Sequence, residues 1–207
     1  MFRTDEIRWF FKKESWSLLK AFHAMGGDSA NGDSRTDHYL YLPPRDDIGV
    51  KIREGQVEIK HRVKINGKKN LSRQISGLSE SWIKWSFSAD PGDPLLNEIV
   101  KGESYRFEST EDPCWIPVLK TRYLIFAQKD EKGELHITHS EPLGDSGLQI
   151  EYSRIRVHEE DWFSFALEWF GGSELQPSVI FNKQIFNEVS LPLEESMGYS
   201  AFLNRLG

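Results

Sequence analysis

Alternation of polar and apolar residues with a period of two is the dominant pattern along this chain, and it predicts strands. About eight strands are expected within the usual boundary error. Eight antiparallel strands are enough to close a β-barrel whose interior holds side chains or one small ligand. The segments with this pattern are Glu6–Phe11, Asp37–Leu42, Gly49–Arg53, Gln56–Lys64, Trp82–Phe87, Trp115–Gln128, Glu134–Ser140, Leu148–Val157 and Trp162–Phe170.

Turn and helix signals separate these strands. Glu54-Gly55 and Asn66-Gly67 each predict a hairpin turn. A helix is expected from Ser15 to Met25, with Ser15 as its N-cap. A second is expected to begin after Asp93, with Pro94 in its first turn, and to end at Gly102. The remaining predictions are a loop over residues 26–34 and a partly helical tail over residues 181–206, with an apolar stripe of Tyr199, Phe202, Leu203 and Leu206.

Three of the predicted strands carry two basic residues at alternate positions. The pairs are Lys51 with Arg53, Lys60 with Arg62, and Lys120 with Arg122. Because successive side chains of a strand point to opposite faces, both members of each pair share one face. That face is either a solvated surface or the basic interior of a barrel that binds a polyanion. Lys84 shares a face with Trp82 and would extend such a lining, whereas Arg154 and Arg156 lie on the opposite face from Glu151.

Composition narrows the function classes. The 207 residues carry a net charge of -6, so a broad nucleic-acid surface is not expected, and any local basic cluster is notable. The single cysteine excludes an intramolecular disulfide and a cysteine-based zinc site. The six histidines show no metal-ligand spacing. Without an apolar run of membrane-spanning length or a signal-peptide core, one cytoplasmic domain over residues 1–207, with no membrane partner, is expected.

Several segments follow one another in an order that resembles a known superfamily. They are Glu6-Ile-Arg8, Asp37–Tyr41, Val50–Arg53, Val57–Lys60, Val118–Arg122, Ile150–Ser153 and Phe165–Glu168. Together they resemble the CYTH superfamily, the triphosphate tunnel metalloenzymes. The resemblance implies an eight-stranded antiparallel barrel with flanking helices, in which basic residues hold a triphosphate and carboxylates hold a divalent metal.

Carried over residue by residue, the resemblance implies a metal-dependent phosphohydrolase acting on inorganic triphosphate or a triphosphate-containing small molecule. Its cofactor would be Mg²⁺ or Mn²⁺. Glu6 and Glu168 would be catalytic, and Glu6, Glu151 and Glu168 would hold the metal. The implied phosphate-binding residues are Arg8, Lys51, Arg53, Lys60, Arg62, Lys120 and Arg122.

The chain also departs from the family pattern. Arg8, Phe10 and Ala166 stand where the resemblance expects Glu, Lys and Glu. Because Mg²⁺ relies on hard carboxylate oxygens, these changes weaken the metal half of the site more than the phosphate half. A non-catalytic barrel that binds a polyphosphate or nucleotide is therefore the alternative hypothesis. In it, the acidic residues neutralise interior cations. A lipocalin-like carrier of an apolar ligand is a third hypothesis, which the cations disfavour.

Overall fold

The computed structural model describes residues 1–27, 32–88, 90, 92–100, 114–139, 141–180 and 188–206. The strands are β1 (Phe2–Phe11), β2 (Asp33–Tyr41), β3 (Ile48–Arg53), β4 (Gln56–Asn70), β5 (Ser76–Ser88), β6 (Cys114–Lys129), β7 (Leu135–Thr138), β8 (Gly147–Val157) and β9 (Glu160–Phe170). The helices are α1 (Trp16–Ala24), α2 (Pro94–Val100) and α4 (Tyr199–Leu206), with short 3-10 helices η1 (Pro177–Val179) and η2 (Leu193–Glu195).

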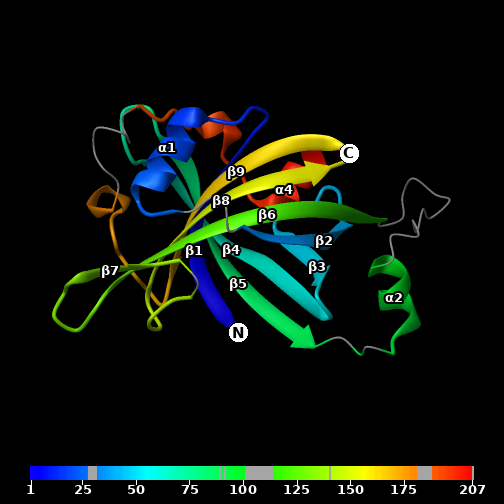
Figure 1. Ribbon diagram of the computed structural model, residues 1–207. Coiled ribbons are helices and arrows are strands. Elements are labelled where there is room, and N and C mark those ends of the chain that lie inside the picture. Colours follow the sequence, from blue (N-terminus) through cyan, green and yellow to red (C-terminus); the bar gives the residue numbers. More distant parts are fainter. Residues whose placement is uncertain are drawn as a thin grey trace.

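The strands of the described chain form one sheet in the order β2-β3-β4-β5-β1-β9-β8-β6-β7 (Figure 1). All pairings are antiparallel, and β2 pairs along its whole length with β6. That pairing closes eight strands into a barrel, and β7 is an extra strand on β6. The predicted eight-stranded antiparallel barrel with flanking helices is therefore confirmed.

One of the two predicted hairpin turns is wrong. The Glu54-Gly55 turn is present, with φ of 48° and 74° at its two residues. Asn66-Gly67 instead lies inside β4, beside a break in register where Gly67 has φ of 94°. Glycine's freedom at positive φ serves a β-bulge as well as a turn, so the dipeptide could not distinguish them. Strand β2 also begins at Asp33, inside the predicted loop, because its first residues pair with β6.

The helix starts agree with the capping signals. Ser15 Oγ accepts from the backbone N–H of Leu18 at 3.3 Å, and Asp93 Oδ1 accepts from that of Leu96 at 3.2 Å. The predicted stop at Gly102 lies outside the described residues, as do residues 181–187 of the predicted tail. The tail does end in the helix α4. No helix in the described part of the chain is both long and apolar enough to cross a membrane.

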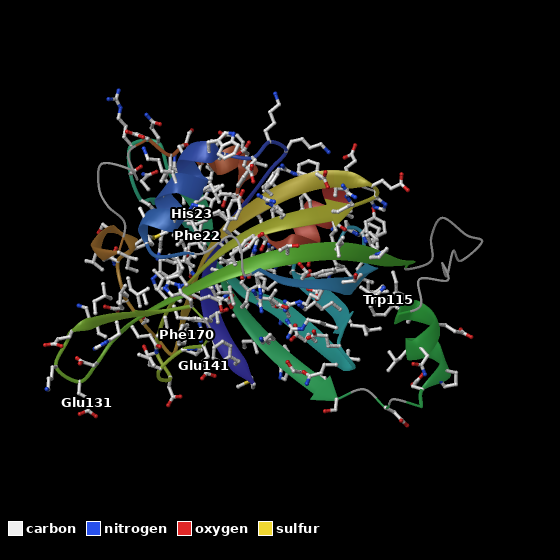
Figure 2. The ribbon with its side chains drawn as sticks, in the orientation of Figure 1. Phe22, His23, Trp115, Glu131, Glu141 and Phe170 are labelled. Atoms are coloured by element: carbon white, nitrogen blue, oxygen red, sulfur yellow. The ribbon has the colours of Figure 1, made fainter. Side chains whose placement is uncertain are left out.

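Strand alternation divides the apolar side chains between the two faces of the barrel wall. On β1, Ile7 and Trp9 face outward and pack in one cluster with Phe22 of α1, which is labelled in Figure 2. Phe10 faces inward, where its ring stacks on Phe202 of α4 at a centroid distance of 4.0 Å. Helix α4 therefore fills one end of the barrel interior with apolar side chains.

Candidate functional site

A cavity of about 410 Å³ occupies the rest of the barrel interior, and we call it the lumen cavity. All eight barrel strands contribute side chains to it. The basic lining residues are Arg8, Arg35, Lys51, Arg53, Lys60, Lys84, Lys120 and Arg122. The acidic ones are Glu6, Glu58, Glu141, Glu151 and Glu168. Eight basic side chains thus line the cavity with five acidic ones. The buried Asp37, which pairs with Arg35 and Lys51, adds a sixth carboxylate to the interior, so basic side chains remain in excess in a chain whose net charge is -6.

The structure brings nearly all of the predicted site residues into this one cavity. The three acidic candidates line it, and so do all the predicted phosphate-binding residues except Arg62. Arg62 is not among the lining residues, and its Nη1 donates to Glu80 Oε1 at 2.6 Å. Arg154 points to the outer face as expected and pairs with Glu14 at 2.9 Å. The cations converge because alternate residues of a strand share one face, and the closed barrel turns that face inward. Their role as phosphate ligands stays a prediction.

Sequence reasoning missed three residues of the interior. Arg35 and Asp37 face inward from β2, where Arg35 Nε donates to Asp37 Oδ1 at 3.1 Å. The same alternation extends to Arg35, but the predicted strand began two residues too late to include it. Tyr199 comes from α4, and its ring lies 5.0 Å from the guanidinium carbon of Arg8 and 4.9 Å from Nζ of Lys120. No local pattern indicates that a C-terminal helix enters the lumen.

Arg8 is bonded to two acidic residues at the floor of the lumen cavity. Its Nε donates to Glu6 Oε1 and its Nη1 to Glu151 Oε1, both at 2.7 Å, and only 6% of the Arg8 side chain is exposed. Glu6 comes from the same strand, two residues earlier, whereas Glu151 comes from β8. A guanidinium suits this position because its planar fork donates to two carboxylates at once.

Lysines complete the pairing of these two carboxylates. Lys120 Nζ donates to Glu151 Oε1 at 2.8 Å, and Lys60 pairs with Glu6 Oε2. Burial by itself raises the pKa of Glu6, but the charges of Lys60 and Arg8 outweigh it and lower that pKa to about 2. The pKa of Glu151 is likewise held well below its usual value by Lys120 and Arg8, against the effect of burial. Both carboxylates are therefore ionised and already neutralised within the protein.

A second network lies on the wall formed by β2, β3 and β4. Lys51 Nζ is 3.0 Å from both Asp37 Oδ2 and Glu58 Oε2, and Arg53 donates to Glu58 Oε1 at 2.6 Å. Burial lowers the pKa of Lys51 to about 8, although Asp37 and Glu58 act in the opposite direction. Burial has the same effect on the pKa of Lys120, also to about 8. Two lumen lysines can therefore lose their charge close to neutral pH.

These contacts do not fit the expected Mg²⁺ or Mn²⁺ site. A divalent ion needs several carboxylate oxygens converging on one point. Here the guanidinium of Arg8 lies between Glu6 and Glu151, and Lys60 lies 4.0 Å from Glu168. The carboxylate oxygens of Glu6, Glu151 and Glu168 do not all lie within 4.8 Å of one another. Internal cations occupy the surroundings in which a metal would sit, so we derive no reaction step through a metal.

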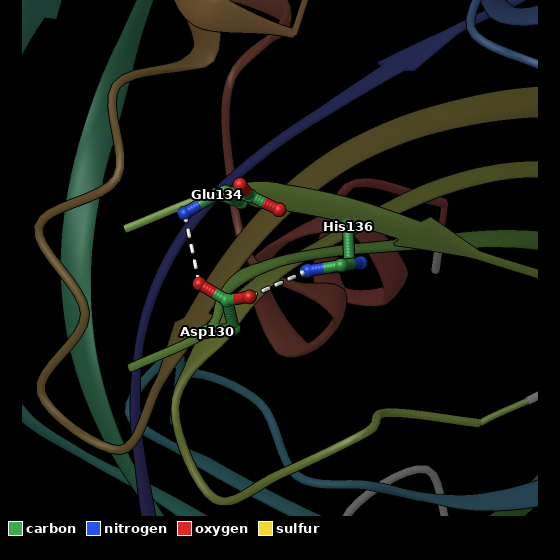
Figure 3. Close-up of side chains that lie close together, drawn as sticks. All are labelled: Asp130, Glu134 and His136. Atoms are coloured by element: carbon green, nitrogen blue, oxygen red, sulfur yellow. Dashed lines mark hydrogen bonds and ion pairs between the residues drawn. The ribbon is translucent and has the colours of Figure 1, made fainter. Parts of the chain in front are cut away.

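The one described group whose potential ligand atoms lie this close together is outside the barrel, in the turn after β6 and the beginning of β7 (Figure 3). Asp130 Oδ1 accepts from the backbone N–H of Lys132 and of Glu134, both at 2.9 Å. Its other oxygen lies 3.0 Å from His136 Nε2. All three members of the group, Asp130, Glu134 and His136, are exposed. The bonds of Asp130 hold the turn, and they explain the cluster without a metal.

Three buried polar groups of lumen-lining residues have no hydrogen-bond partner among the described residues. They are Nε of Arg122, Nε1 of Trp82 and the hydroxyl of Tyr199. Buried N–H groups in native proteins nearly always find a partner, because an unmade hydrogen bond costs free energy. Because these atoms are shielded from the open space of the cavity, they do not identify what it binds.

Comparisons with known proteins add little to this geometry. No family model matches the chain, and no curated protein matches it. Similar solved structures include the PH1012 protein from Pyrococcus horikoshii OT3 and a conserved hypothetical protein, Pfu-838710-001, from Pyrococcus furiosus. Each is 14% identical in sequence to this chain, with a TM-score of 0.39. Each match covers 92% of this chain, and it covers 93% of the PH1012 chain and 94% of the Pfu-838710-001 chain. A likeness this weak carries no argument about function.

Proposed function

We propose that the barrel binds a small polyanion of the polyphosphate class in its lumen cavity, and that it does so without a divalent metal. The observation that carries this proposal is the excess of basic over acidic side chains in the barrel interior of an acidic protein. Charge-assisted hydrogen bonds from Arg and Lys to phosphate oxygens are among the strongest available to a protein, and partial exclusion of water strengthens them.

The arrangement of the cavity suits a short chain of phosphates. Arg122, Lys84 and Arg53 lie on different strands of the lining, so phosphate groups between them would be contacted from more than one side. Because α4 fills one end of the interior, a phosphate chain would enter from the other end and place its terminal group toward Tyr199. The resemblance of the sequence to triphosphate tunnel proteins supports the same class of ligand.

Binding is favoured over metal-dependent hydrolysis because of Arg8. In the hydrolase hypothesis, Glu6 and Glu168 would hold a metal that polarises the terminal phosphoryl group. In the structure, Glu6 is bonded to Arg8 and paired with Lys60. An apolar carrier function is disfavoured more strongly, because eight basic side chains line the space that its ligand would occupy.

Calorimetric titration with inorganic triphosphate tests the proposal. We expect binding in EDTA that is at least as tight as in Mg²⁺, because Mg²⁺ neutralises part of the ligand's charge and the protein supplies its own cations. Affinity should fall steeply as salt is raised, since screening weakens each contact. Phosphate release with Mg²⁺ or Mn²⁺ should be absent. No binding in EDTA, or binding only when a divalent ion is added, would overturn the proposal.

Triphosphate affinity should also decrease as the pH rises through about 8. Lys51 has a pKa of about 8, so below that value it is charged and attracts phosphate, and above it the charge is lost. Replacing Lys51 with arginine keeps the charge at every pH used, so the Lys51→Arg variant should lose less affinity between pH 7 and pH 9. Titration of the ligand itself affects both proteins equally. Parallel pH profiles of the two proteins would show that Lys51 does not contact the ligand.

A further inference from the structure

Strand β4 extends beyond its neighbour β3 and therefore has an open edge. β4 pairs with β5 along its whole length, but β3 pairs only with residues 56–61 of β4. On the side away from β5, no described strand pairs with residues 63–70. We call these residues the open edge of β4. An open edge presents unpaired backbone N–H and C=O groups, which can pair with another chain.

The backbone bonds of the following turn show which residues point outward from this edge. The N–H of Leu71 donates to the carbonyl of Ile75 at 2.9 Å, on the side of β5. In an antiparallel ladder, neighbouring residues direct their backbone groups to opposite sides, and the register from Lys68 to Asn70 is regular. Lys68 and Asn70 therefore point their N–H and C=O groups away from β5. No backbone group of another described segment bonds to them.

The open edge and the turn after it carry basic side chains without acidic partners. They are Lys64, Lys68, Lys69 and Arg73, all of them exposed. None forms an ion pair with a described residue, whereas the exposed Arg154 and Arg156 do. Residues 59–73 contain no Asp or Glu, although the whole chain has a net charge of -6. The positive charge of this edge is therefore available to a partner.

Apolar and charged features of the edge together indicate the partner. Val63 and Ile65 are 40% and 53% exposed and would contact the side chains of an added strand. A second copy of this chain does not fit, because pairing two such edges would set lysines against lysines. Opposite charges across a strand pair are stabilising, so acidic side chains complement Lys64 and Lys68. A nucleic acid would use the cations but leave the backbone groups of the edge unpaired.

We propose that the open edge of β4 binds an extended acidic segment of a partner protein, which adds to the sheet as a further strand. Backbone hydrogen bonds to residues such as Lys68 and Asn70 provide affinity, and the cations select acidic side chains. Lys64, Lys68 and Arg73 do not line the lumen cavity. This interaction surface is therefore separate from the site of the proposed function, and each proposal can fail without the other.

Fluorescence anisotropy tests the proposal with labelled probes of equal charge. They are a peptide as long as the open edge with alternating Glu and Thr, the same peptide with Pro in place of Thr, and a short oligodeoxythymidylate. Proline has no N–H, so it cannot donate to a ladder. When the full chain is titrated in, the Glu-Thr peptide should bind about tenfold more tightly than either other probe, because only it forms several backbone hydrogen bonds. An excess of inorganic triphosphate should not displace it.

Two variants separate the charges from the backbone edge. Lys64→Gln with Lys68→Gln should weaken binding of the Glu-Thr peptide about fivefold, as expected for two exposed ion pairs. Asn70→Pro removes one outward N–H and no bond to β5, so it should weaken binding about threefold, whereas Asn70→Ala should not. The matched control, Arg154→Gln with Arg156→Gln, removes two exposed charges from β8 and should leave the affinity unchanged.

The opposite results would overturn the added strand. Equal affinity for the Glu-Pro peptide or the oligonucleotide would show that the surface recognises charge alone, and so would an Asn70→Pro variant that binds like Asn70→Ala. Unchanged affinity in the double lysine variant, or displacement by triphosphate, would place the peptide elsewhere. Absence of binding by every probe would also reject the proposal, whatever the lumen cavity binds.

Discussion

Replacing Arg8 with methionine is expected to lower the free energy of unfolding by about 3 kcal/mol, the lower end of the range for breaking a buried ion pair. The substitution keeps the bulk of the side chain but leaves Glu6 and Glu151 each with one hydrogen-bonded cation fewer in a buried site. The lower end applies because Lys60 still pairs with Glu6 and Lys120 with Glu151. Denaturant unfolding at neutral pH, followed by tryptophan fluorescence, measures the change.

The control is the same substitution in an exposed ion pair. Arg154 pairs with Glu14 on the outer face and is 52% exposed, so Arg154→Met should cost at most about 1 kcal/mol. Adding Glu151→Gln to Arg8→Met should recover part of the loss, because it removes a buried charge left with too few partners. Equal losses in Arg8→Met and Arg154→Met would contradict the central position assigned to Arg8.

Removing two lumen cations together, Lys84→Ala with Arg122→Ala, is expected to weaken triphosphate binding about a hundredfold or more. Each charge-assisted hydrogen bond contributes on the order of 1.5–3 kcal/mol, and 1.4 kcal/mol is a factor of ten. These two residues are the least neutralised internally. No ion pair to Lys84 is found within the described residues, and Arg122 pairs only with the half-exposed Asp33, at 3.2 Å. Calorimetric titration in EDTA provides the affinities.

The matched control removes the same number of charges from the outside of the wall. Arg154 and Arg156 lie on β8 with their side chains exposed, paired with Glu14 and Asp161. The Arg154→Ala, Arg156→Ala double variant should change triphosphate affinity little, because salt screens these exposed charges from a ligand inside the lumen cavity. A similar loss in both double variants would mean that net charge, and not the lumen cavity, attracts the ligand.

The sequence by itself determined most of the strands and which of their residues share a face. Alternation depends only on local backbone geometry, so the shared face of Lys120 and Arg122 and the opposite face of Arg154 could be assigned from spacing. Capping is equally local, which is why Ser15 marked the start of α1. Composition made the basic cluster notable, because it does not follow from the charge of the whole chain.

Only the tertiary structure decided what the interior charges do. Arg8 was recognised as a departure from the family pattern, but its bond to Glu151 joins residues 143 positions apart. The effect of a buried charge depends on which partners surround it and how much water remains, and sequence spacing contains neither. The closure of β2 on β6 and the entry of Tyr199 from α4 are also decided by contacts between residues far apart in the sequence. Alternation therefore predicted which charged residues share a strand face, while closure of the barrel made those faces a lumen and packing determined that its carboxylates are bonded to cations.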